Sequence, residues 1–98
     1  MQFQITSIAE QELSEALDYY KEIELNLAVR FLREFEVIRD RILQFPNSGH
    51  PRGAYRIAII HGFPHCVAYT QQHDSLIVEA VAHMHRDIAY WKDILSRI

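Results

Sequence analysis

The sequence contains a single cysteine, Cys66, among its 98 residues, and this cysteine stands in an apolar context. One thiol cannot form an internal disulfide, and a cysteine-based metal site needs several thiols. The chain is therefore not a disulfide framework, and we expect neither a metal nor another cofactor. A reducing cytoplasm is its expected location.

Long apolar runs are also missing. The longest ones fall far short of the roughly 20 residues that span a bilayer. The N-terminal residues MQFQITS have neither the basic region nor the apolar core of a signal peptide. We therefore expect no contact with a membrane and no targeting segment.

Lysine is scarce, with two residues in a chain whose formal net charge is −3. Residues 1–45 carry nine acidic and five basic side chains, whereas residues 46–98 carry four acidic side chains, five basic ones and all six histidines. A protein that binds nucleic acid by itself usually neutralises phosphates with clustered lysine and arginine. The charge balance argues against that role.

Glycine is limited to three positions, and each lies in a turn-like context. None has the spacing, or the strand-to-helix setting, of a loop that cradles phosphate. The sequence thus offers no nucleotide-binding motif.

The first half of the chain predicts a strand and two helices. Phe3 and Ile5 alternate with polar residues, as in a half-buried strand. Ser7 and Glu10 fit a capping box that starts a helix, which should fray near Ile23. A second helix follows after a short connection at residues 22–26 and ends before Pro46, because the residue before proline avoids helical geometry. Its expected core side contains Ala28, Phe31, Leu32, Phe35, Ile38, Ile42 and Phe45.

The second half predicts a meander of three strands and a last helix. Turn chemistry fills residues 46–53, and the expected strands are Tyr55–His61, His65–Thr70 and Leu76–Met84. The short connections between them favour antiparallel hairpins. Asp87 is a plausible N-cap for a helix from Ile88 to about Arg97.

These elements predict an α+β fold in one domain over residues 1–98, in the order β-α-α-β-β-β-α. Each element has one apolar face, so a small twisted antiparallel sheet should carry the N-terminal helical hairpin on one face. Along the last strand, Leu76, Val78, Ala80, Ala82 and Met84 form the apolar set that should face the core. Strict alternation then sends Glu79 and His83 to the open face, where Arg56 and His65 could join them.

Candidate chemistry gathers in the stretch AVAHMHRDIAYW, from Ala80 to Trp91. His83, His85 and Arg86 stand at a strand end, where an imidazole could act as a general base and the guanidinium could stabilise an anion. On spacing alone, a polar strand end with a hydrogen-bonded histidine explains them better. Metal binding is weaker still, because the H-x-H spacing fixes no third ligand.

The neighbouring aromatics and the arginines of the second helix favour structural interpretations. An aromatic pair on a terminal helix usually docks that helix on the core, so we interpret Trp91 as structural and leave the role of Tyr90 open. The arginines of the second helix alternate with Glu34, Glu36 and Asp40, which is typical of a solvated face with local ion pairs; they are Arg30, Arg33, Arg39 and Arg41.

With these elements in order, the chain resembles the RelE/ParE superfamily, the toxins of bacterial type II toxin–antitoxin systems, and specifically its ParE-like branch, which includes plasmid stabilisation proteins. The resemblance spans nearly the whole chain and depends on the order and spacing of three groups of residues. The groups are Phe45-Pro46-x-x-Gly49, then Arg56 ahead of Gly62-Phe63-Pro64-His65 and Val67-x-Tyr69, and last Ala80-Val81-x-His83-x-x-Arg86 followed by Tyr90-Trp91.

The chain departs from this resemblance in its basic residues. Relatives commonly show H-x-R-R-x-P-x-Y-W, whereas this chain has His85 in place of the first arginine and Ile88 in place of the proline. Ile94 stands where an arginine often follows the tryptophan. These changes weaken the basic patch and its expected potency.

The resemblance implies a toxin that inhibits growth and forms a hetero-oligomer with a cognate antitoxin encoded next to it. ParE-like members are associated with inhibition of DNA gyrase, whereas RelE-like members cut messenger RNA in the ribosome. We favour a non-enzymatic gyrase inhibitor that binds its target through Arg56, Arg86, Tyr90 and Lys92. The alternatives are a ribosome-dependent ribonuclease, with His83, His85, Arg86 and Tyr90 as its catalytic residues, and a degenerate toxin that retains only antitoxin binding.

Overall fold

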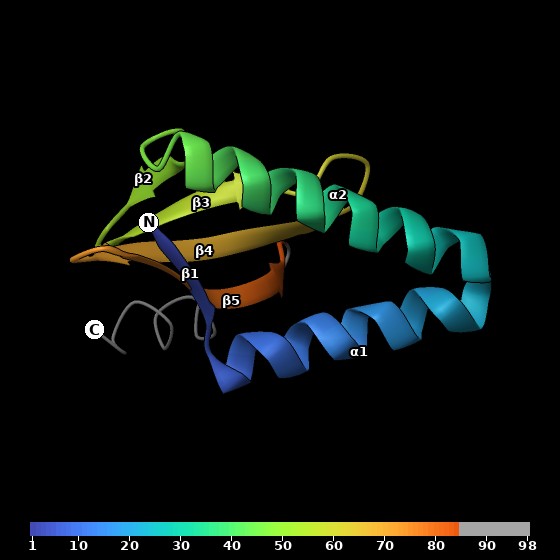
Figure 1. The fold of residues 1–98 in the computed structure, drawn as a ribbon. Coiled ribbons are helices and arrows are strands. Elements are labelled where there is room, and N and C mark those ends of the chain that lie inside the picture. Colours follow the sequence, from blue (N-terminus) through green and yellow to red (C-terminus); the bar gives the residue numbers. More distant parts are fainter. Residues whose placement is uncertain (85–98) are drawn as a thin grey trace.

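The structure is a computed structural model that describes residues 1–84 (Figure 1). It confirms an α+β fold in which two helices precede most of the sheet. The elements are β1 (Gln2–Ile5), α1 (Ser7–Ile23), α2 (Leu25–Gln44), β2 (His50–Arg52), β3 (Tyr55–Ile59), β4 (His65–Gln72) and β5 (Ser75–His83). The helix expected from Ile88 to Arg97, with Trp91, lies outside the described residues.

The described strands form one five-stranded sheet in the order β1-β5-β4-β3-β2. β2, β3, β4 and β5 pair antiparallel in sequence order, whereas β1 pairs parallel with β5, from Gln2 opposite Ser75 to Ile5 opposite Val78. The prediction of a purely antiparallel sheet is therefore wrong at this edge. The two helices and the meander bring β5 back beside β1 in the same direction.

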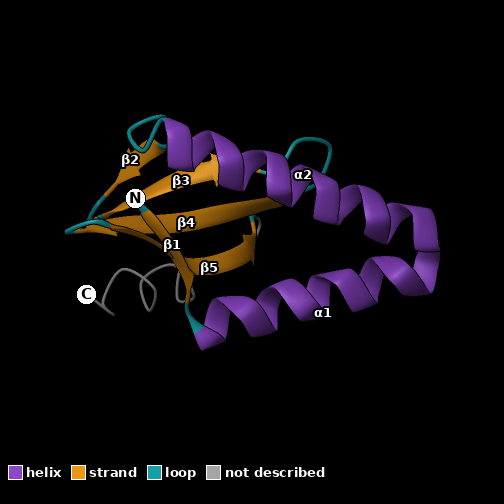
Figure 2. Cartoon of the chain, in the orientation of Figure 1, coloured by secondary structure: helices purple, strands orange, loops and turns teal. Residues whose placement is uncertain are grey.

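The helical hairpin lies over one face of the sheet, and its turn projects past the end of the strands (Figures 1 and 2). The expected hairpin is confirmed, and its connection is shorter than predicted, because Glu24 alone separates the two helices. Phe45 caps the C-terminus of α2 just before Pro46, as the sequence predicts. No helix within residues 1–84 combines the length and apolar character needed to cross a membrane.

The N-cap of α1 is Thr6 rather than Ser7. Thr6 has extended backbone geometry, and its Oγ1 accepts a hydrogen bond of 3.1 Å from the Ala9 amide. Its hydroxyl also lies 3.4 Å from the Glu79 carbonyl oxygen, to which it donates. This second bond connects the start of α1 to β5. A capping pattern involves only adjacent residues and cannot predict such a long-range contact.

A short strand, β2, occupies part of the segment for which only turns were expected. It pairs with β3, from His50 opposite Ile57 to Arg52 opposite Tyr55. The connecting turn contains Gly53 with a φ of 61°, a backbone conformation that suits glycine. The expected turns are present, and between them three residues pair with β3 as a short strand.

The main core lies between the helices and the sheet and contains Phe31, Ile60 and Leu76, each fully buried. Most of the core side of α2 is as predicted. Leu32 and Phe45 are the exceptions, because they are 39% and 58% exposed. Neither side chain belongs to the main core.

A β-bulge divides β5 into two halves, and the alternation of side chains between the two faces of the sheet is reversed from one half to the other. Ala80 pairs with Ala68 but Val78 pairs with Tyr69, so that Glu79 is an extra residue without a partner on β4. Leu76, Val78 and Val81 consequently all belong to the main core, and Ala80 belongs to a second apolar cluster with Tyr55 and Ala68. The prediction that Ala80 and Ala82 continue the core-facing set is wrong because the extra residue reverses the alternation.

Candidate functional site

The bulge places His83 on the face of the sheet that the helices cover, not on the open face as strict alternation predicts. His83 ends β5 and pairs with His65 at the start of β4. The centroids of the two imidazole rings lie 5.3 Å apart, in an edge-to-face arrangement. The sequence-predicted meeting of His65 and His83 is therefore correct, but it occurs under α1.

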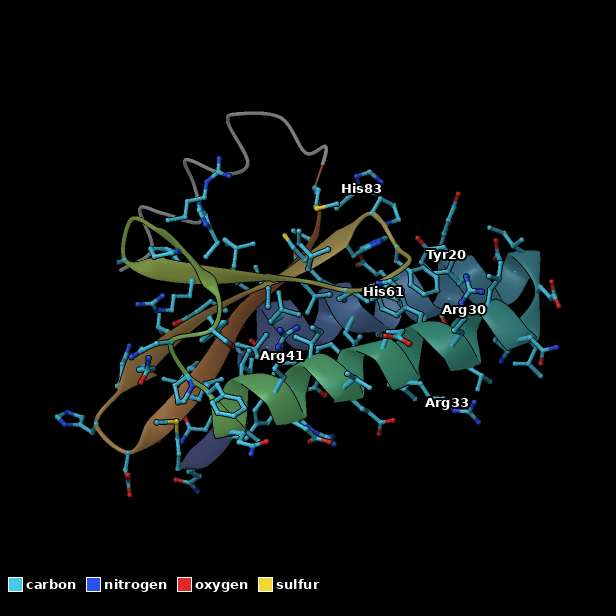
Figure 3. All side chains as sticks on the ribbon, turned by 90° about the horizontal axis from the view of Figure 1, so that it is seen from above. Tyr20, Arg30, Arg33, Arg41, His61 and His83 are labelled. Carbon is cyan, nitrogen blue, oxygen red and sulfur yellow. The ribbon has the colours of Figure 1, made fainter. Side chains whose placement is uncertain are left out.

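Tyr20 reaches this histidine pair from α1 (Figure 3). Its Oη lies 3.4 Å from His65 Nδ1, and its ring stacks on Phe31 with centroids 5.3 Å apart. Phe63 meets the same ring edge-on at 5.0 Å. Burial, followed by the neighbouring Tyr19, raises the pKa of Tyr20, so the phenol keeps its proton at neutral pH.

A cleft opens beside these three residues, between α1 and the ends of β4 and β5. We call it the α1 cleft, and it consists of two adjoining hollows of about 360 and 140 Å³ that share Ala16, His65 and His83. The larger hollow is also lined by Tyr19, Tyr20, Ile23 and Pro64. The smaller is also lined by Glu12, Glu15 and Val81.

Glu12 attaches α1 to the sheet at the acidic end of the α1 cleft. Its Oε1 accepts a hydrogen bond of 3.0 Å from the Val81 amide of β5, beyond the point where β1 stops pairing. With the Thr6 bond to the Glu79 carbonyl, this contact satisfies backbone groups at the edge of β5. The walls of the cleft are therefore fixed to each other by hydrogen bonds.

Arg56, the first predicted target-binding residue, lies far from the histidine pair. It is opposite Tyr69, four residues along β4 from His65, which corresponds to about 13 Å of strand. Its guanidinium donates to the carbonyl oxygens of Asn47 at 3.1 Å and of Gly49 at 2.8 Å. The structure thus makes Arg56 a support of the loop after α2, and the expected joining of Arg56 and His83 on an open face is wrong.

Tyr69 completes this loop support from the adjacent strand. Its buried hydroxyl donates to the Pro46 carbonyl at 2.7 Å and accepts from the Gly49 amide at 2.9 Å. A Cβ added to Gly49 would meet Tyr69 Oη at 2.6 Å, so only glycine allows this approach. Three of the residues that carry the family resemblance, Pro46, Gly49 and Tyr69, therefore have a shared structural role.

The remaining predicted site residues, His85, Arg86, Tyr90 and Lys92, lie outside the described residues. Of the proposed nuclease set, the structure places His83 alone. Among residues 1–84, its neighbours in the α1 cleft include Tyr20, Glu12 and Glu15, and no arginine of that range lines the cleft.

Neither a metal site nor a reactive thiol arises from the residues that the structure describes. Between residues 1 and 84, no three histidine, cysteine or acidic side chains lie close enough to hold an ion. Burial raises the pKa of Cys66 to about 11, with smaller effects from Arg52 and Glu12. The thiol is therefore protonated at neutral pH and is a poor nucleophile.

None of the α2 arginines lines the α1 cleft, although Arg30 approaches it through Phe63, whose ring packs against Tyr20. Figure 3 shows Arg30 and Arg33 toward the turn of the hairpin and Arg41 toward the other end of α2. The Arg30 guanidinium lies over the Phe63 ring, 5.1 Å from its centroid. These positions agree with the predicted solvated face.

Sequence reasoning missed the contribution of α1 to the site. Tyr20 lies on the buried side of α1, but its hydroxyl contact with His65 depends on the tertiary arrangement. A detectable signal did exist in Glu12, Glu15, Tyr19 and Ile23, which follow at helical steps of three and four and mix charge with large apolar groups.

Comparisons with known proteins identify a family and a shared fold. Residues 3–88 match the family model described as the ParE toxin of the type II toxin–antitoxin system, parDE. The solved structure of the chromosomal ParDE toxin–antitoxin system from P. aeruginosa contains a chain of similar fold, with a TM-score of 0.73. The sequences are 15% identical, and the match covers 85% of this chain and 95% of that one. No curated protein sequence gives a significant match.

Proposed function

The chain belongs to the ParE toxin family of type II toxin–antitoxin systems, and on this premise we propose that it is a growth-inhibiting toxin that binds and inhibits DNA gyrase in the cytoplasm. A cognate antitoxin encoded beside it neutralises the toxin by forming a complex with it. The observation that carries this proposal is the family match, which extends over residues 3–88.

The surface of the hairpin supports an antitoxin partner. Five large apolar side chains near its turn are more than a third exposed, namely Tyr19, Ile23, Leu25, Val29 and Leu32. Exposed apolar groups gathered in one region are typical of protein-binding surfaces. A segment that folds as it binds can cover such a region while wrapping around the toxin.

Electrostatics favour gyrase binding over cleavage of messenger RNA. A ribonuclease that uses His83 as an acid or base needs cations near the scissile phosphate. The pairing of His83 with His65 favours such chemistry, but Glu12 and Glu15 line the same cleft and would repel a phosphate. We therefore place mRNA cleavage second.

The target-binding residues that we propose are Arg86, Tyr90 and Lys92, which follow β5 in the sequence. Arg56 was predicted with them, but its guanidinium is bound to two loop carbonyls. We expect its replacement to act through stability, whereas replacement of Arg86 should act through the target.

A growth experiment tests the toxin–antitoxin assignment. Induced expression of the chain alone should stop growth, and co-expression of the adjacent small reading frame should restore it. A stably folded chain that does not slow growth at high expression would contradict the assignment as an active toxin. If such an inactive chain still bound the antitoxin, the result would support the alternative that the protein is a degenerate toxin.

A further inference from the structure

The outer side of α1 carries a continuous row of four residues that line the α1 cleft. Glu12, Glu15, Tyr19 and Ile23 follow at helical spacing, and each lines one of its two hollows. The row is about 16 Å long at 1.5 Å per residue. That length matches three turns of a partner helix or about five residues of an extended strand.

The two ends of this row have different chemistry. Toward the turn of the hairpin, Tyr19 is 61% exposed and Ile23 is 58% exposed, although both are large apolar side chains. Toward the start of α1, Glu12 and Glu15 present carboxylates beside His65 and His83. A complementary segment therefore needs an apolar side chain at one end and a cationic side chain at the other.

The acidic character extends over the whole exposed side of α1. The helix contains five carboxylates and one lysine. Within residues 1–84, no basic side chain forms an ion pair with Glu15, Asp18 or Glu22. Glu15 instead accepts a hydrogen bond of 3.1 Å from the Gln11 side-chain amide. This surface attracts a cationic partner and repels nucleic acid.

A second copy of the chain is a poor occupant of this cleft. In a two-fold dimer the same patch meets itself, so two acidic rows would face each other and like charges would oppose association. A partner segment with lysine or arginine would instead be attracted by the carboxylates and by the exposed aromatic ring of this row. Its cation can approach Glu15 and can also lie over the exposed Tyr19 ring in a cation–π contact.

We infer that the α1 cleft is the docking site for a basic amphipathic segment of the antitoxin, with an apolar side chain against Tyr19 and Ile23 and a lysine or arginine against Glu15. The inference rests on the proposed function, because that function supplies an antitoxin. The narrow, partly apolar row suits a short segment better than the flat surface of a large enzyme.

Four variants of the full toxin, assayed against the adjacent-gene antitoxin by calorimetry, test this site. Tyr19→Ala and Glu15→Lys alter the row, and each should weaken antitoxin affinity by about tenfold or more. Asp18→Lys is the matched charge control, because Asp18 is exposed on the same helix but does not line the cleft. Val37→Ala is the apolar control, because Val37 is 56% exposed on α2. Both controls should change affinity less than about threefold.

Salt dependence provides a second readout of the cationic contact. Affinity of the wild-type toxin should fall as ionic strength rises from about 50 to 500 mM, and the fall should be shallower for Glu15→Lys. Thermal melts confirm that each variant is folded before its affinity is interpreted.

Several outcomes would overturn the inference while leaving the proposed function intact. One is that all four variants bind the antitoxin as tightly as the wild type. Another is that Asp18→Lys weakens binding as much as Glu15→Lys, which would indicate a diffuse charge effect rather than a docking site. A third is that the purified toxin is a dimer that Tyr19→Ala converts to a monomer, which would make a second copy the occupant. Failure of the proposed function is distinct, since the wild-type toxin itself would then bind no antitoxin.

Discussion

The imidazole rings of His65 and His83 lie 5.3 Å apart on the helix-covered face of the sheet. They meet there because the unpaired Glu79 shifts the register of β5 by one residue between Val78 and Ala80. This single residue places His83 beside α1 and Tyr20, and it creates the floor of the α1 cleft.

Thr70 should stabilise this bulge. Its hydroxyl is buried and donates to Glu79 Oε2 at 3.0 Å. Thr70→Val removes the donor at nearly constant volume and should lower the free energy of unfolding by about 1–3 kcal/mol, because the acceptor is a carboxylate. Thr70→Ser, which keeps the hydroxyl, should lose less. Urea denaturation measures both, and a valine variant as stable as the wild type would show that the bulge does not need this bond.

Gly49 and Tyr69 should be energetically coupled. Gly49→Ala places a methyl group 2.6 Å from Tyr69 Oη, and we expect a destabilisation of about 1–3 kcal/mol. Tyr69→Phe alone leaves the buried Gly49 amide without its acceptor, at a similar cost. The double variant should be less destabilised than the sum of the two, because the phenylalanine removes the nearest clashing atom, although the ring carbon Cε1, 2.8 Å from the added Cβ, remains. Strict additivity in denaturation experiments would argue against the predicted contact.

Local patterns predicted the helices, the turns and the meander, because helical periodicity and Pro46 are properties of adjacent residues. The parallel pairing of β1 with β5, the Thr6 cap and the bulge at Glu79 depend on contacts between residues more than seventy positions apart or on neighbouring strands. The face of His83 was consequently mispredicted, although its pairing with His65 followed from the hairpin. No sequence pattern predicts the hydrogen bonds that Arg56 donates to the loop carbonyls, because they too depend on the tertiary arrangement.

Stability should decrease at alkaline pH partly through Cys66. Burial raises the pKa of this thiol to about 11, whereas an exposed thiol in the unfolded chain ionises near pH 8.5. The folded state therefore binds an extra proton between these values, so its stability is fully present below about pH 8.5 and is lost as pH rises toward 11. The loss attributable to Cys66 is on the order of 3 kcal/mol once the pH exceeds both values.

Cys66→Ala should make the free energy of unfolding less dependent on pH between about 8.5 and 11. The substitution also removes packing contacts, but that loss of stability should be the same at every pH. Denaturation midpoints at pH 7, 9 and 10.5 for the two proteins provide the comparison. Parallel profiles would show that the thiol does not contribute.

Potency should respond to the residues after β5 rather than to Arg56. Arg86→Ala should reduce growth inhibition while the melting temperature changes little, because we propose that Arg86 acts through the target rather than through folding. His85→Arg, which restores the residue that relatives commonly carry, should raise potency. Arg56→Ala is the control, and it should lower the melting temperature because two loop carbonyls lose their donor. An Arg86→Ala toxin that melts normally and stops growth at the wild-type dose would exclude Arg86 from the target contact.

A DNA supercoiling assay with purified gyrase tests the proposed mechanism most directly. The toxin should block supercoiling or trap cleaved DNA in proportion to its concentration, and addition of the adjacent-gene antitoxin should restore gyrase activity. A parallel reaction with programmed ribosomes should leave the messenger RNA intact. Unaffected gyrase together with codon-specific cuts in the messenger would contradict the account and identify the toxin as a ribosome-dependent ribonuclease.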